Sequence, residues 1–96
     1  MKVIISESAS EDIVAGYDFY ESQEWGLGRY FRDSVFADID SLQFFAGMHP
    51  RFYGNHRLLS KHFPFAVFYV VDADVAVIQA VLDCRRNPAW IRRKLK

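Results

Sequence analysis

The chain of 96 residues is long enough for one small domain, and its 51% hydrophobic and 17% aromatic residues can form a core without a metal or a disulfide. A single cysteine, Cys84, excludes an internal disulfide and is typical of a reducing cytoplasm. The apolar runs 3–5 and 63–71 are too short for a signal peptide and for a membrane span. We therefore expect a cytoplasmic protein with no membrane partner.

Charge is divided unevenly along the chain. Residues 1–48 carry three basic and nine acidic side chains, a net charge of −6, whereas residues 49–96 carry nine basic and three acidic ones, a net charge of +6. A basic half of this size predicts an anionic partner, although two oppositely charged halves can also complement each other in the folded molecule.

The first half of the chain predicts one strand followed by two helices. Residues 2–6 (KVIIS) are β-prone, and Ser8 and Glu11 fit a capping box at the start of a first helix. A second helix is predicted over residues 27–46, where Gly47 is a natural stop. Its apolar stripe comprises Leu27, Phe31, Val35, Ile39, Leu42 and Ala46. Because the link through Gly26 and Gly28 is short, the two helices should form an antiparallel hairpin.

The second half predicts a loop over residues 48–55 and then three strands, at 56–60, 65–71 and 75–84, joined by short turns into an antiparallel meander. Residues 89–95 predict a short basic helix or tail. The expected fold class is α+β, in two layers and one domain spanning residues 1–96: an N-terminal strand, an antiparallel two-helix hairpin, and a three-stranded antiparallel meander.

The last predicted strand has two different faces when it is read with a period of two. One face is wholly apolar: Ala76, Ile78, Ala80, Leu82 and Cys84. We expect this face to pack on Phe31, Val35, Ile39 and Leu42 of the helices, with Cys84 a packed thiol rather than a nucleophile. The other face is mixed, and we expect it to stay partly open: Val75, Val77, Gln79, Val81, Asp83 and Arg85.

Four basic residues are candidates for contacts with phosphate or carboxylate groups: Arg57, Lys61, Arg85 and Arg86. Phe63, Tyr69 and Trp90 can supply stacking surfaces, a combination that suits single-stranded RNA or an acidic peptide. The alternative is that the arginines are solvated and the aromatic rings belong to the core.

Three histidines, His49, His56 and His62, match no compact zinc pattern, so no metal and no other cofactor is expected. They can act as acids or bases near neutral pH, or lie in surface loops.

Two stretches, HRLLSKHFPFAVFY and VLDCRRNPAW, follow this element order in a way that resembles the RelE/ParE superfamily of toxins from bacterial type II toxin–antitoxin pairs. The resemblance covers nearly the whole chain. In the second stretch, Val81, Arg85 or Arg86, and Pro88 approximate a terminal pattern of that superfamily, with Asp83 where a histidine is common.

The resemblance implies a toxin that arrests growth when it is free of its antitoxin protein. ParE-like members poison DNA gyrase, whereas RelE-like members cut messenger RNA in the ribosome, often with a tyrosine or histidine near the C-terminus. This chain has neither residue after Tyr69. We therefore expect ParE-like action on gyrase. A ribosome-dependent mRNA endoribonuclease and a non-toxic binding module remain the alternatives.

The catalytic candidates, if the chain is a nuclease, are Arg57, Lys61, Arg85 and Arg86. The basic half should dock an antitoxin segment that carries acidic and aliphatic side chains. The expected antitoxin-binding residues are Arg57, Val75, Val77, Val81 and Arg85. The chain can form a homodimer or a toxin–antitoxin hetero-oligomer.

Overall fold

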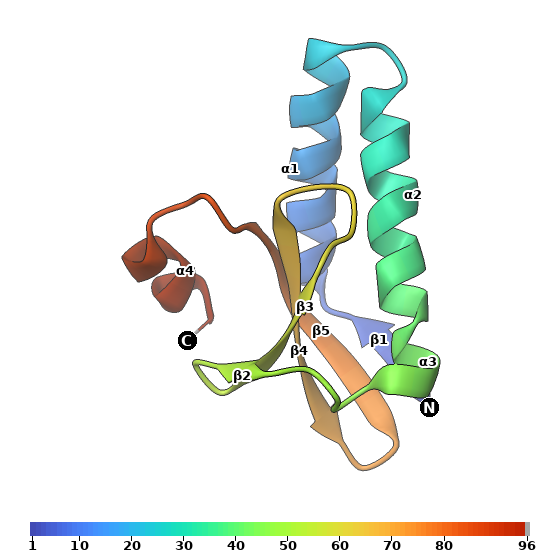
Figure 1. Ribbon diagram of the computed structural model, residues 1–96, viewed down its shortest axis with the longest axis vertical. Coiled ribbons are helices and arrows are strands. Elements are labelled where there is room, and N and C mark those ends of the chain that lie inside the picture. Colours follow the sequence, from blue (N-terminus) through green and yellow to red (C-terminus); the bar gives the residue numbers. More distant parts are fainter. Residues whose placement is uncertain (96) are drawn as a thin grey trace.

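The computed structural model describes residues 1–95, which form one five-stranded sheet with helices on both faces (Figure 1). The elements in chain order are β1 (Lys2–Ile5), α1 (Glu7–Gln23), α2 (Leu27–Asp40), α3 (Leu42–Phe45), β2 (Arg51–Phe52), β3 (Asn55–Leu59), β4 (Phe65–Asp72), β5 (Val75–Asp83) and α4 (Pro88–Leu95). The strand order is β1-β5-β4-β3-β2, with β1 parallel to β5 and every other pair antiparallel. The predicted α+β class is confirmed.

The start of α1 differs from the predicted capping box. Ser6 is the N-cap: its Oγ accepts a hydrogen bond from the backbone N–H of Ala9 at 3.0 Å. Ser8, the predicted cap, lies inside the helix and is exposed. The cap therefore falls two residues earlier, directly after β1, and leaves almost no linker between the strand and the helix.

The two long helices form the predicted antiparallel hairpin and approach each other closely at two glycines. A Cβ at Gly16 would lie 2.5 Å from Cζ of Phe31, and one at Gly28 would lie 2.6 Å from the carbonyl oxygen of Tyr17. The Glu21 carboxylate caps the start of α2 by accepting the N–H groups of Gly26 and Gly28 at 3.0 and 2.9 Å. The predicted single helix over residues 27–46 is wrong in one respect, because it breaks after Asp40 and continues as the short α3.

The main core lies between this hairpin and one face of the sheet. The apolar stripe of α2 and α3 confirms its prediction: Phe31, Val35, Ile39 and Leu42 are between 0% and 2% exposed. They pack with Tyr69 of β4 and Ile78 of β5, among others. None of the helices described for residues 1–95 is long and apolar enough to cross a membrane.

A β-bulge in β5 changes which of its side chains face the helix hairpin, so this part of the prediction is wrong. Tyr69 pairs with Ile78, whereas Phe68 pairs with Ala80, so Gln79 is an extra residue. After it, Val81 turns toward the hairpin and is 1% exposed, while Ala80 and Leu82 turn to the opposite face. There they pack beneath α4, through Trp90, Ile91 and Leu95. The predicted contacts of the α2 stripe with Ala80 and Leu82 are therefore wrong, and the opposite face is only partly open.

Two further strands shape the edges of the sheet. The short β2 lies inside the predicted loop and joins β3 through a two-residue turn in which both Tyr53 (φ 53°) and Gly54 (φ 79°) have positive φ. Such a turn matches the twist of a hairpin, so it places Phe52 and Tyr53 beside β3. On the other edge, β1 leaves Ile4 42% exposed.

Candidate binding pocket around Arg57

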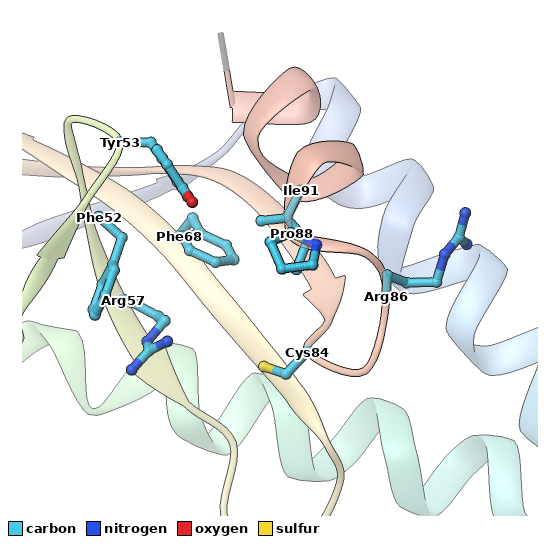
Figure 2. A pocket seen from close by; sticks show the side chains of 8 residues that line it. All are labelled: Phe52, Tyr53, Arg57, Phe68, Cys84, Arg86, Pro88 and Ile91. Carbon is cyan, nitrogen blue, oxygen red and sulfur yellow. The ribbon is translucent and has the colours of Figure 1, made fainter.

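A cavity of about 230 Å³ opens on the α4 face of the sheet, where β2, β3, β4 and the segment after β5 meet (Figure 2). Its walls are Phe52, Tyr53, Arg57, Phe68, Cys84, Arg86, Pro88 and Ile91. Arg57 and Phe68 are partners across β3 and β4, so both side chains lie on this face. The pocket is therefore mostly apolar with a cation at its rim.

Arg57 has no carboxylate partner among residues 1–95. Its guanidinium carbon lies 3.9 Å from the centroid of the Phe52 ring, and its Nε is buried without a hydrogen-bond partner. The aromatic face stabilises the cation but satisfies none of its N–H donors. This half-buried arginine is therefore available to a carboxylate or phosphate that enters the pocket.

Cys84 lies in the turn after β5, where it is exposed, so its prediction as a packed thiol is wrong. Its position is fixed by its backbone N–H, which donates to the Pro64 carbonyl at 2.8 Å. Although the side chain reaches the surface, the pocket walls around it raise the pKa of the thiol, and the nearby Arg57 charge offsets this only in part. The thiol form therefore predominates at neutral pH.

Arg86 contributes to the pocket wall, but its guanidinium points away from the cavity (Figure 2). The guanidinium carbon lies 3.9 Å from the centroid of the Trp90 ring in α4, inside a second cleft between α4 and α1. Of the four basic candidates, Arg57 is thus the one whose guanidinium lies beside this pocket.

Arg85 and Lys61 lie elsewhere. Arg85 forms a bidentate ion pair with Asp83, with N–O distances of 2.7 and 3.0 Å, and these hydrogen bonds lower the pKa of the Asp83 carboxyl. Lys61 is exposed in the loop after β3 and faces a separate cavity beside α2. The structure therefore does not assemble the four predicted cations into one cluster.

The predicted antitoxin-binding valines are also divided. Val75 and Val77 are half-buried on the α4 face, which they share with Arg57, but Val81 belongs to the core under the hairpin. Of the three aromatic rings considered as stacking surfaces, two pack inside the protein, which agrees with the alternative that they belong to the core. Tyr69 is 0% exposed, and Phe63 packs against the rings of Tyr20 and Phe31, whereas Trp90 is half-buried beneath Arg86.

Two of the three histidines make hydrogen bonds within the protein: His49 lies in the loop before β2, and His56 lies in β3. His49 Nδ1 is hydrogen-bonded to the buried Tyr69 hydroxyl, which also accepts the Gly47 N–H at 2.9 Å. His56 donates from Nδ1 to the His49 carbonyl at 2.8 Å and stacks on the Tyr69 ring. The surface-loop alternative is therefore wrong for His56, which is half-buried in a strand, whereas His49 and the exposed His62 do lie in loops. No group of three or more His, Cys, Asp or Glu side chains in residues 1–95 is placed to hold a metal.

Five residues of the pocket were not identified as candidates from the sequence: Phe52, Tyr53, Phe68, Pro88 and Ile91. Glycine at position 54 signals a tight turn, but the strand on its N-terminal side is only two residues long and gives no periodic pattern.

Comparisons with known proteins identify a solved structure with a similar fold. A chain in the solved structure titled "Chromosomal ParDE TA system from P. aeruginosa" superposes with a TM-score of 0.73 and 20% sequence identity, over 84% of this chain and 92% of that chain. No protein-family model matches the sequence, and no curated protein matches it. The superposition covers most of both chains, so the two share a fold, and it agrees with the fold that the sequence resemblance implied.

Proposed function

We propose that this chain is the toxin of a type II toxin–antitoxin pair that acts, like ParE, on DNA gyrase in the cytoplasm. The observation that carries the proposal is the likeness in fold to a chain of a ParDE TA system, over most of both chains. The element order and the two sequence stretches that resemble the RelE/ParE superfamily support the same assignment.

The antitoxin, in this proposal, docks on the part of the sheet that α4 leaves uncovered. Ile4, Val77 and Val70 lie side by side across β1, β5 and β4 on this face, exposed or half-buried. Arg57 lies on the same face, one strand further and without an acidic partner in residues 1–95. An antitoxin segment with aliphatic and acidic side chains complements this surface, giving a toxin–antitoxin hetero-oligomer.

The pocket chemistry supports gyrase over messenger RNA as the target. Arginine stays protonated and serves poorly as a general base. Among the described residues that line the pocket, Tyr53 and Cys84 are the ones able to exchange a proton, and the raised pKa of Cys84 disfavours its thiolate. A ribosome-dependent nuclease needs proton transfer as well as a phosphate-binding cation.

Inducible expression of the chain, alone and together with its co-encoded partner, tests this proposal. We expect growth arrest that the partner relieves, a loss of supercoiling by purified gyrase, a fall in newly labelled DNA before newly labelled protein, and intact messages by primer extension. Arg57→Ala should weaken the arrest, whereas Arg29→Ala, an exposed arginine on the acidic hairpin, should leave it unchanged.

Two outcomes contradict the proposal. Cleaved messages with normal gyrase activity identify a RelE-like nuclease. Normal growth, despite a folded protein that binds its partner, identifies a non-toxic binding module.

A further inference from the structure

A separate cavity, of about 350 Å³, lies between α2 and the loop that joins β3 to β4. One wall is a face of α2 that carries Asp33, Ser34 and Asp38, and the opposite wall carries Lys61 and His62. It shares no residue with the Arg57 pocket. Its ligand is therefore determined by its own side chains.

Asp38 is the unusual group in this cavity. Its side chain is 6% exposed, and its Oδ2 is buried without a hydrogen-bond partner in residues 1–95. No basic side chain of these residues lies within ion-pair distance of it, although Lys61 borders the same cavity. A buried carboxylate oxygen without a hydrogen-bond donor is unfavourable, so Asp38 lacks a partner in the free chain.

The other residues around the cavity determine which chemical group can pair with Asp38. The ring of Tyr30 borders the cavity, is 49% exposed, and lies 5.7 Å from the ring of His62. Ser34 adds a hydroxyl, and Asp33 adds a second carboxylate nearer the solvent. A carboxylate at the base, an aromatic face and a hydroxyl acceptor together match a planar cation with several N–H donors.

We infer that this cavity binds the guanidinium group of an arginine on a partner protein, with Asp38 as its main acceptor. The guanidinium donates to the Asp38 carboxylate and to the Ser34 oxygen while its face stacks on Tyr30. A divalent metal fits poorly, since no three metal-binding side chains group together in residues 1–95. The site does not depend on the proposed toxin function, because it uses neither Arg57 nor the sheet surface.

The positive charge of Lys61 should oppose the binding of an arginine in this cavity. Its flexible ammonium lies in an exposed loop across the cavity from Asp38, so it competes electrostatically with an incoming arginine. Removing the Lys61 charge should therefore strengthen binding rather than weaken it. A purely structural role for Lys61, as the partner of Asp38, predicts the opposite result.

The test is a titration of the ¹⁵N-labelled chain with the peptide acetyl-Gly-Arg-Gly-amide, followed by NMR, against the same peptide with citrulline in place of arginine. Citrulline has nearly the same shape but no charge. We expect saturable shifts at the amides of Ser34, Asp38 and His62 with the arginine peptide only. Asp38→Asn should weaken binding by about tenfold or more, and Lys61→Met should tighten it.

The matched control is Asp40→Asn, which makes the same charge change on an exposed residue of the same helix. It should alter affinity by about twofold at most, because exposed charges are screened. Equal shifts with the citrulline peptide, or equal affinities of the Asp38→Asn and Asp40→Asn proteins, would overturn the inference. If Asp38→Asn fails to fold, the two peptides and Lys61→Met on the otherwise native chain still decide it.

Discussion

Arg57 and Asp38 are charged side chains that the fold holds without an opposite charge among residues 1–95. Arg57 is half-buried and rests on the Phe52 ring, so part of its desolvation is offset. Asp38 has no such contact and is more deeply buried. Each cost would be recovered if a group of opposite charge bound, as proposed for an acidic group at Arg57 and a guanidinium at Asp38.

Stability should fall in mildly acidic solution because of His49. Burial lowers the pKa of His49 below its ordinary value of 6.5, and the neighbouring His56 lowers it further. The folded state thus holds His49 neutral, while the unfolded chain takes up a proton more readily. The resulting stability is complete above pH 6.5 and is lost as the pH falls toward the lower folded pKa.

Urea unfolding at a series of pH values between 7.5 and 5 measures this effect. We expect the free energy of unfolding to decrease as the pH falls, and the His49→Gln variant to show a flatter profile. His62→Gln, at an exposed position, should keep the slope of the unsubstituted chain. Equal slopes for all three proteins would remove His49 as the source.

Single-residue environments were the least predictable feature. Cys84 follows an apolar strand in sequence, but the chain turns at this residue, so the thiol faces a pocket instead of the core. Tyr69 had two possible roles, as a stacking surface or as part of the core; it belongs to the core, and its hydroxyl is hydrogen-bonded within the protein by Gly47 and His49. These hydrogen bonds join residues twenty or more positions apart, and no local pattern in the sequence encodes them.

Among the elements, β5 depends on a contact from α1. The pairing of β1 with β5 ends at Ile5 and Ile78, so the further part of β5 has no strand beside it on that edge. Asp12 of α1 takes the place of a strand partner: its Oδ2 accepts the backbone N–H of Val81 at 3.0 Å. Burial raises the pKa of the Asp12 carboxyl, and this hydrogen bond opposes the shift.

Replacing Asp12 by alanine should therefore destabilise the protein. The Val81 N–H would lose its acceptor next to a side chain that is 1% exposed, a loss of about 1–3 kcal/mol in the free energy of unfolding. Asp12→Asn keeps an oxygen acceptor and should retain most of the stability. Glu11→Ala, at an exposed neighbouring position, should change it by less than about 0.5 kcal/mol. Chemical denaturation compares the three, and an Asp12→Ala value equal to that of Glu11→Ala would contradict the role.

The order of the elements was predictable because each carries a strong local signal, such as the spacing of Phe31, Val35 and Ile39 in α2. The bulge at Gln79 was not. Apolar residues occupy both faces of β5, so the sequence reads equally well with or without an extra residue. The missed bulge led directly to the wrong faces for Ala80, Val81 and Leu82, and hence to an open surface where α4 packs.

For the whole molecule, the charge division in the sequence corresponds to separate parts of the fold. The exposed surfaces of α1 and α2 carry most of the acidic residues, whereas α4 exposes Arg92, Arg93 and Lys94. The −6 and +6 halves do not neutralise each other through ion pairs: the two within residues 1–95 each join close neighbours in sequence. The charges of the two halves are therefore not cancelled by direct ion pairs within residues 1–95, and the described part of the molecule has an electric dipole.

Association with the co-encoded partner should consequently depend on salt. We expect the association rate constant to fall steeply as ionic strength rises, because opposite charges steer the encounter. Arg57→Glu should slow association and reduce the salt dependence. Arg29→Glu, on the acidic hairpin, should have little effect. Surface-binding kinetics at several salt concentrations provide the measurement, and an unchanged rate and salt slope for Arg57→Glu would place the docking surface elsewhere.

The parallel pairing of β1 with β5 has a consequence for how the chain acquires its fold. Lys2 pairs with Val75 and Ile5 with Ile78. The first strand to be synthesised, β1, therefore cannot form its backbone hydrogen bonds with the sheet until the last strand, β5, is available. Until then the α1–α2 hairpin has only part of its sheet to pack against. Contacts between such distant positions slow folding, so a nascent chain should remain incompletely folded until β5 has left the ribosome.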